Sequence, residues 1–341
     1  MSKKTTIYDI AKALNITAAT VSRALNQNPS ISKSTRDLVM KTATKMNYEQ
    51  NKLALALKSG KSYNIGVIVP RIDSNFFASV IRGIEDELSP LGYHVIITQT
   101  HEIEDREAQT IDTLLNAQVD GILMSLSKAN TAIKYFERVL KKNVPLIFFD
   151  RKKDIKGVSS VTIDDFEGGY KATKHLIDQG YKKIAHFSVN QNIEIYLERY
   201  KGYKQALIDN GLNVNEAYNI QGKSSLEGGI KAMESLLKLT SPPDALFSSS
   251  DFAALGAIKT LKKHNIKVPS EFAVVGFSNE PFTKFMELSI TSVDQSPLEM
   301  GKMAAKVFLE QVNNNGVKIE KKVVLEPELL IRKSSQRIVE K

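Results

Sequence analysis

Hydrophobic positions recur at helical spacing in three stretches of the first 48 residues. They are Ile7, Ile10, Ala11 and Leu14, then Val21 and Leu25, then Leu38, Val39, Thr42, Ala43 and Met46. Each stretch follows a residue whose side-chain oxygen can cap a helix, namely Thr6, Thr17 or Ser32. Asn15, which tolerates a left-handed turn, separates the first stretch from a second helix over 18–26. Three short helices around one core, with a tight turn between the first two, predict a helix-turn-helix module.

From residue 63 the pattern changes to short apolar runs that alternate with longer amphipathic stretches. The runs predict strands at 65–69, 94–98, 120–124, 145–150, 160–163, 183–187, 218–220, 245–248 and 273–277. The stretches predict helices at 76–91, 105–117, 129–142, 168–179, 196–210, 225–239 and 252–264. Buried runs between helices are typical of parallel sheets covered on both faces. Two such series predict two α/β subdomains with a ligand cleft between them.

Positive charge is concentrated at the N-terminus. The 341 residues carry a formal charge of +9, and residues 1–61 contain eleven basic residues against three acidic ones. A basic segment that also has helical periodicity indicates a polyanion partner such as nucleic acid, because Lys and Arg displace its counterions. The remaining chain is nearly neutral and long enough to build substantial cores.

Composition excludes several other functions. The chain has no Cys, which rules out disulfides, thiolate nucleophiles and Cys-type zinc sites and fits a reducing compartment. Its five His residues are scattered, and neither a dinucleotide fingerprint nor a phosphate loop occurs. We therefore expect no catalytic residues, no metal and no cofactor. No apolar run approaches the roughly 20 residues of a membrane helix, and no signal peptide is evident, so we expect a cytoplasmic protein with no membrane partner.

The N-terminal residues resemble the lactose/galactose repressor (LacI/GalR) family of transcriptional regulators. The resemblance lies in the runs TIYDIA from Thr6, ITAATVSRALN from Ile16, SKSTR from Ser32 and MNY from Met46. One departure is Asn15, where the family usually has Gly. The resemblance implies a helix-turn-helix DNA-binding domain at 1–48, a hinge helix at 49–61 and an effector-binding core at 62–341.

The resemblance also implies which residues contact double-stranded operator DNA of pseudo-palindromic sequence. Bases are contacted by Ala18, Ala19 and Arg23, and by Leu57, which matches the leucine that the family's hinge inserts into the minor groove. Arg23 has the two donors suited to guanine, with a surface ion pair as the alternative. The expected phosphate contacts, for which a plain capping role is the alternative, are Thr6, Tyr8, Thr20, Ser22, Asn26, Ser32 and Thr35.

The body resembles the same family, whose core is like the periplasmic sugar-binding proteins. The resemblance covers nearly the whole chain and includes GVIVP from Gly66, RYKGY from Arg199, DFAALG from Asp251 and VVGF from Val274. It implies an N-subdomain at about 62–162 and 294–323 and a C-subdomain at about 163–293 and 324–341. No terminal leucine heptad follows, so a homodimer is expected.

The resemblance implies a sugar-derived effector and candidate contacts for it. Most of them lie at predicted strand ends or in the first strand-to-helix loop, and Arg199 opens the Arg-x-x-Gly element. The candidates are Asp73, Ser74, Phe76, Phe77, Asp150, Arg199, Ser250, Asp251, Ser278 and Gln295. Ser250 and Ser278 depart from the Asn and Asp that the family usually has. Together with Arg71 and Arg151 nearby, they predict a less acidic pocket and a ligand that is larger than a hexose or carries an acid or phosphate.

Other function classes remain open at this stage. A periplasmic-type sugar receptor without a DNA role fits the body but not the basic head. A nucleoid-type DNA binder fits the head but not the cleft residues. An enzyme could use Asp164 and Asp165 as paired acids, although adjacent acids before a predicted helix more plausibly cap it. The preferred hypothesis is an effector-controlled transcriptional regulator, most simply a repressor.

Overall fold

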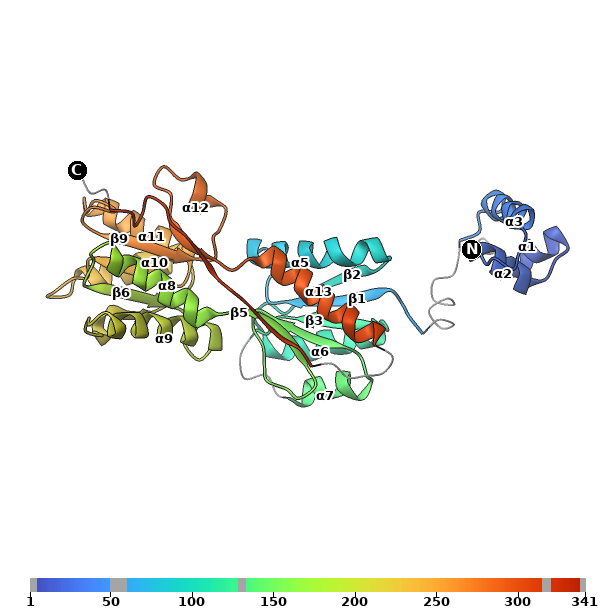
Figure 1. The fold of residues 1–341 in the computed structure, drawn as a ribbon, viewed down its shortest axis with the longest axis horizontal. Coiled ribbons are helices and arrows are strands. Elements are labelled where there is room, and N and C mark those ends of the chain that lie inside the picture. Colours follow the sequence, from blue (N-terminus) through green and yellow to red (C-terminus); the bar gives the residue numbers. More distant parts are fainter. Residues whose placement is uncertain (1–4, 50–59, 128–132, 315–319, 338–341) are drawn as a thin grey trace. The chain divides into compact units, whose positions relative to one another are not determined.

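The computed structural model describes residues 5–49, 60–127, 133–314 and 320–337. The chain divides into a head unit, Met1–Ser62, and a core unit, Tyr63–Lys341 (Figure 1). Among its described residues the head unit consists of α1 (Ile7–Leu14), α2 (Ala18–Leu25) and α3 (Lys33–Lys45). Their inward faces form one small apolar core around Ile10, Val21 and Val39.

Local side-chain bonds fix where the head helices begin, as the sequence predicts. The Thr6 side chain accepts a hydrogen bond from the Asp9 amide, and the Asp9 carboxylate accepts one from the Thr6 amide, which completes a capping box. Thr17 and Ser32 cap α2 and α3 through the amides three residues on. Asn15 has a φ of 53°, the left-handed turn expected between α1 and α2.

One predicted core position of the head is wrong. Val39 is fully buried and Ala43 nearly so, but Leu38 is 52% exposed. Adjacent residues on a helix point about 100° apart, so Leu38 and Val39 cannot both face so small a core.

The core unit contains two lobes, each built on a six-stranded sheet. The first lobe has the strand order β11-β5-β4-β3-β1-β2, and every pairing is parallel. Its strands are β1 (Asn64–Val69), β2 (His94–Gln99), β3 (Gly121–Met124), β4 (Leu146–Phe149), β5 (Ser159–Ile163) and β11 (Lys322–Leu325). Its helices are α5 (Asn75–Leu88), η1 (Ser89–Leu91), α6 (Glu104–Asn116), α7 (Lys134–Lys141) and α13 (Pro297–Asn313).

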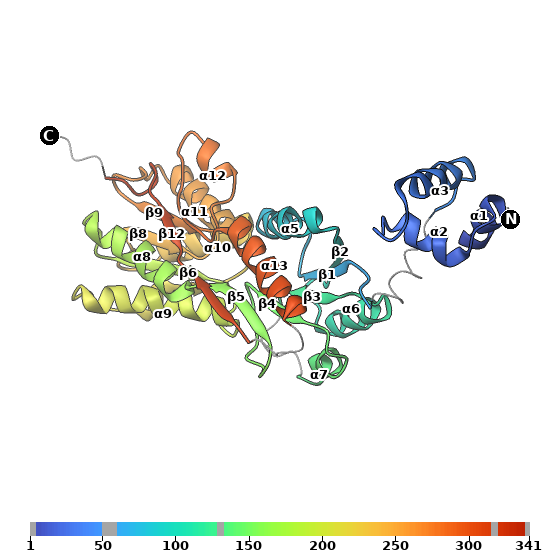
Figure 2. The same ribbon diagram turned by 45° about the vertical axis from the view of Figure 1, so that its right-hand side comes forward.

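The second lobe has the strand order β12-β10-β9-β8-β6-β7, in which only β12 runs antiparallel to its neighbour. Its strands are β6 (Ile184–Ser188), β7 (Asn219–Gln221), β8 (Ala245–Ser248), β9 (Ala273–Phe277), β10 (Thr291–Asp294) and β12 (Glu328–Leu330). Its helices are α8 (Asp165–Asp178), α9 (Glu194–Asp209), η2 (Glu216–Tyr218), α10 (Leu226–Leu237), α11 (Asp251–Lys263) and α12 (Phe282–Phe285). The chain passes between the lobes after β5, β10 and β11, so each lobe is completed by distant parts of the sequence (Figure 2).

The predicted fold class is confirmed, and most predicted elements lie within a few residues of the observed ones. The exception in length is α7, which begins at Lys134, whereas the predicted helix began at 129; residues 128–132 lie outside the described part. The two predicted series did not include β10, β11, β12, α12 or α13. Helix α13 belongs to the first lobe and packs closely on α5, where a Cβ on Gly301 would lie 2.0 Å from the Val80 carbonyl oxygen. Among the described helices, none has both the length and the apolar character needed to cross a bilayer.

Candidate functional sites

Helix α2 presents the residues that the sequence predicts as base contacts. Val21 and Ala24 are buried in the head core, which leaves the opposite face of the helix outward. Ala19 and Arg23 are exposed there, and Ala18 is half-buried. Arg23 forms no ion pair with any residue that the structure describes. An exposed guanidinium without an internal partner keeps its donors for an external acceptor.

Most of the predicted phosphate contacts lie at or near the helix N-termini, while Ser22 lies within α2 and Asn26 caps its C-terminus. The predicted contacts are Thr6, Tyr8, Thr20, Ser22, Asn26, Ser32 and Thr35. Thr6 and Ser32 do cap their helices, so the alternative role holds for both, while Tyr8 is 72% exposed. The Asn26 amide donates to the Ser22 carbonyl oxygen at 2.8 Å. Leu57 and most of the predicted hinge lie outside the described residues.

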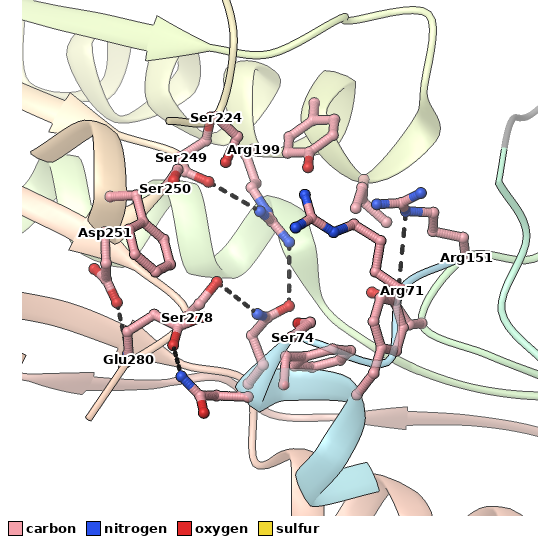
Figure 3. Close-up of a pocket in the computed structure, with 18 of the residues that line it drawn as sticks. Arg71, Ser74, Arg151, Arg199, Ser224, Ser249, Ser250, Asp251, Ser278 and Glu280 are labelled. Atoms are coloured by element: carbon pink, nitrogen blue, oxygen red, sulfur yellow. Dashed lines mark hydrogen bonds and ion pairs between the residues drawn. The ribbon is translucent and has the colours of Figure 1, made fainter. Parts of the chain in front are cut away.

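A cavity of about 290 Å³ lies in the core unit, lined by residues of both lobes (Figure 3). All ten predicted effector contacts are among its lining residues: Asp73, Ser74, Phe76, Phe77, Asp150, Arg199, Ser250, Asp251, Ser278 and Gln295. They come from loops at the carboxyl ends of parallel strands and from the first turns of the helices that follow. In open parallel sheets, ligands bind beyond the carboxyl ends of the strands, which is where these lining residues meet.

Arg199 is an enclosed positive charge of the cavity, with 3% of its side chain exposed. Its Nε donates to Asp165 Oδ1 at 2.7 Å, its Nη1 to the Ser249 carbonyl oxygen at 3.3 Å and its Nη2 to Gln295 Oε1 at 3.2 Å. The guanidinium carbon lies 3.7 Å from the centre of the Phe277 ring. Arg199 is therefore held in one orientation by four different neighbours.

Asp251 lines the cavity, but its carboxylate is occupied by the protein. Oδ1 accepts a hydrogen bond from Ser292 Oγ at 2.7 Å. Oδ2 accepts one from the Glu280 amide at 2.8 Å (Figure 3). Burial raises the pKa of Asp251 to about 7, against the opposing effect of those two hydrogen bonds. Its position therefore suits holding the loop after β9 in place more than direct contact with a ligand.

The loop that Asp251 holds also connects the lobes. Glu280 Oε2 accepts a hydrogen bond from the Asn75 side chain of the first lobe at 2.7 Å. Asn75 is the first residue of α5, and both residues line the cavity. A ligand in the cavity therefore lies beside a direct contact between the two lobes.

Asp150 follows β4 at the floor of the cavity and is 8% exposed. Burial raises its pKa, while the nearby Arg151 and a hydrogen bond of 3.0 Å from Ser125 Oγ act in the opposite direction. Arg151 in turn donates to the Glu102 carboxylate at 2.9 Å. The Asp150 carboxylate thus lines the cavity as a buried hydrogen-bond acceptor for a ligand hydroxyl.

The expectation of a less acidic pocket is wrong. Arg71 forms a bidentate pair with Asp73, and Arg151 is paired with Glu102. Glu102 and Glu280 are lining residues that the sequence analysis did not include. The arginines that were expected to attract an acidic ligand are already neutralised by the chain itself.

Several residues around the cavity have strained backbone conformations. Asp150, Ser278, Asn279 and Ser296 all have positive φ, of 59°, 111°, 49° and 48°. Such φ values are uncommon for residues with a Cβ. They are found mainly at functional sites, where surrounding contacts hold the backbone in an unfavourable conformation. These four residues follow the ends of β4, β9 and β10, where the loops beside the cavity begin.

Sequence reasoning missed several lining residues, namely Asn75, Glu102, Ile195, Tyr196, Ser224, Ser249, Phe252 and Glu280. Asn75 and Ser249 sit beside predicted candidates, so widening each loop by one residue would have found them. Asp164 does cap α8, because its carboxylate accepts a hydrogen bond from the Glu167 amide at 2.8 Å. The capping role predicted for its neighbour Asp165 is wrong, because the Asp165 carboxylate pairs with Arg199. No local signal distinguishes the two aspartates, since the pairing spans 34 residues.

Comparison with known proteins places the chain in a family. Residues 62–329 match "Periplasmic binding proteins and sugar binding domain of LacI family", and residues 6–51 match "Bacterial regulatory proteins, lacI family". The chain belongs to the LacI family. The resemblance seen in its motifs is thereby confirmed, and this LacI-family protein is a transcriptional regulator with a DNA-binding domain and a sugar-binding type of core. The family is one of regulators and not of enzymes, and the alternative of a receptor without a DNA role is not supported.

Relatives extend over nearly its whole length. Catabolite control protein A of Priestia megaterium is 33% identical over 92% of this chain and 94% of the relative. The repressor PurR of Mannheimia succiniciproducens is 29% identical over 98% and 99%. The solved complex of the regulator CelR with cellobiose has a TM-score of 0.72 at 25% identity, covering 97% of this chain and 100% of that one. A Lac repressor dimer bound to operator shares the fold, with a TM-score of 0.87 at 22% identity over 98% and 100%.

The raised pKa of Asp251 predicts how stability depends on pH. Between its usual value of 3.8 and about 7 the folded state holds a proton that the unfolded state has lost, so stability falls as pH rises through this range and levels off above it. Asp251→Asn removes the titrating group. We expect urea unfolding from about pH 4 to 8 to show wild-type stability falling relative to the variant as pH rises. Asp178→Asn, at an exposed ion pair, serves as the control, and a pH-independent difference for Asp251→Asn would contradict the assignment.

Proposed function

We propose that this regulator reads a pseudo-palindromic operator with α2 and that a small carbohydrate-derived effector in the core cavity controls its affinity for DNA. The observation that carries the DNA part is the outward face of α2, where exposed Arg23 forms no ion pair with a described residue and lies opposite a buried face. In this proposal residues 1–48 bind DNA, 49–61 form the hinge that carries Leu57, and 62–341 form the effector core. The site of action is cytoplasmic DNA, and catalysis has no part in it.

In the proposed contact, Arg23 donates to a guanine edge, while Ala18 and Ala19 present methyl groups to the neighbouring bases. The seven predicted hydroxyl, phenol and amide side chains contact phosphates and set the register. Residues 1–61 carry eleven basic groups against three acids, which favours approach to any duplex. Specificity then depends on few direct contacts, with Arg23 the strongest.

The effector part rests on the cavity between the lobes. An effector that prefers one arrangement of the lobes shifts the equilibrium toward it, and the hinge transmits the change to the head. Related proteins include repressors, which favours repression as the outcome of operator binding. The Asn75–Glu280 hydrogen bond between the lobes gives the effector a contact to strengthen or displace.

A second copy of the chain is the proposed partner of the core. Phe285 is 85% exposed on α12, and Phe252 beside it on α11 is 43% exposed. In the first lobe, Ile72, Ile97 and Ile103 are exposed around the free edge of β2. Helices α5 and α12 lie on the same side of the core unit in both views (Figures 1 and 2). Exposed apolar residues on both lobes suit a two-fold interface.

Arg23→Ala tests base reading. After the operator is selected from random duplexes, the variant should lose about 1–3 kcal/mol of specific binding free energy, because a bidentate contact with guanine is removed. Its affinity for random DNA, measured by gel shift at the same salt, should fall far less. Lys12→Ala removes one charge from α1 and should weaken both kinds of binding by the same factor. Equal losses for Arg23→Ala would remove it from base readout.

A sugar panel tests the effector role. We expect at least one neutral mono- or disaccharide, with ribose and cellobiose included, to raise the melting temperature and to change operator affinity in gel shifts. Asp150→Asn should reduce that stabilisation, because a carboxylate that accepts from a ligand hydroxyl is lost. Asp112→Asn, in an exposed ion pair with Arg138, is the control. A panel that stabilises the protein without changing operator affinity would contradict the coupling.

Phe285→Asp tests the dimer. A carboxylate at a position that is apolar and 85% exposed should leave folding intact but shift the core toward monomer. Sedimentation velocity of the full chain measures the shift. Ile208→Asp, at a residue 56% exposed on α9, is the matched control and should remain dimeric. An unchanged dimer for Phe285→Asp would place the interface elsewhere.

A further inference from the structure

Arg199 carries a permanent positive charge in the enclosed floor of the cavity. A guanidinium stays protonated in proteins, and burying it without a counter-charge is strongly unfavourable. Of its hydrogen-bond acceptors, the Ser249 carbonyl and the Gln295 amide are neutral, and only Asp165 is a carboxylate. The stability of this charge in the folded core therefore depends on Asp165.

Asp165 reaches Arg199 from behind the cavity. It is the first residue of α8, is 7% exposed and is not among the lining residues, so a ligand does not touch it. The chain after β9 supplies no charge at the equivalent place on the other side, since Ser278 stands there and its Oγ accepts a hydrogen bond from Gln295 at 3.0 Å. Gln295 thus links Arg199 to a neutral hydroxyl. Among the described residues, Asp165 is the carboxylate that hydrogen-bonds Arg199, and the Asp150 carboxylate of the cavity wall adds a longer-range attraction.

We propose that Asp165 is the positioning residue that fixes Arg199 over Phe277 and cancels its charge, so that the cavity excludes anionic groups and takes a hydroxyl-rich ligand without a negative charge. This inference rests on the proposed effector role of the cavity and specifies its ligand class. A phosphate or carboxylate on a ligand would meet an arginine that is already neutralised.

The other charged groups of the cavity act in the same direction. Arg71 is paired with Asp73, and Arg151 with Glu102. Asp150 and Glu280 add two further carboxylates to the walls, while both oxygens of Asp251 accept hydrogen bonds from the protein. Such a surface accepts hydrogen bonds from ligand O–H or N–H groups, and carboxylates repel an anion.

Inorganic sulfate tests this directly, because it is an anion of fixed charge and needs no knowledge of the natural ligand. Sulfate binding to the full chain is measured by calorimetry, and the part that depends on Arg199 is isolated by comparison with Arg199→Gln. We expect no Arg199-dependent binding in the wild type. Asp165→Asn, which keeps the shape but removes the charge, should bind sulfate at least about tenfold more tightly, equivalent to about 1.4 kcal/mol. The double variant Asp165→Asn/Arg199→Gln should lose this gain.

Asp164→Asn is the matched control on the same helix. Its carboxylate caps α8, and Asn caps equally well, so sulfate binding should not change. Arg199-dependent sulfate binding by the wild type, or no gain in Asp165→Asn, would overturn the proposal. A gain that persists without Arg199 would also overturn it, because the anion would then bind elsewhere.

A relocated charge keeps the test decisive if Asp165→Asn does not fold. Asp165→Asn/Ser278→Asp places a carboxylate on the opposite side of the same network. It should restore folding, measured by thermal melting, and exclude sulfate again. Failure to fold would show that Asp165 is needed for packing at its own position and would overturn the charge argument. Operator binding by the head is measured separately, so failure here and failure of the proposed function remain distinguishable.

Discussion

The buried ion pair between Arg199 and Asp165 is the constraint on which the site depends. Two charges with 3% and 7% of their side chains exposed are compatible with a folded core only when they face each other with hydrogen bonds completed. Here the pair joins α9 to the start of α8, and Gln295 extends it to the segment that returns to the first lobe. The same network that stabilises the second lobe therefore sets the shape and charge of the cavity.

The cavity lies where a small change can be transmitted. Strained backbone at Asp150, Ser278 and Ser296 stands at strand ends, and the chain crosses between the lobes next to Ser296, after β10. The Asn75–Glu280 bond joins the lobes beside the cavity, while Asp251 fixes the loop that presents Glu280. A ligand that fills this space contacts both lobes at once, which is the physical requirement for coupling occupancy to their arrangement.

Prediction from sequence succeeded where structure depends on near neighbours. The caps at Thr6, Thr17 and Ser32 and the left-handed Asn15 follow from side chains within three residues, and all were observed. Prediction failed where neighbours in space are far apart in sequence. Leu38 has the spacing of a core residue, but the head core is too small to bury it. The position of Asp165 predicts a second helix cap, whereas in the fold it pairs with Arg199, 34 residues away.

The sequence by itself determined the three capped helices and the alternation that produces two parallel sheets, because both follow from local spacing. Its resemblance to the LacI/GalR family identified all ten candidate residues that line the cavity. Only the tertiary structure decided which carboxylate neutralises which arginine. Sequence spacing does not predict the distances within the three ion pairs, which are Arg71–Asp73, Arg151–Glu102 and Arg199–Asp165. The strength of each pair depends on that distance and on burial. The charge that the cavity offers to a ligand is therefore a property of packing, although every residue that creates it was visible in the sequence.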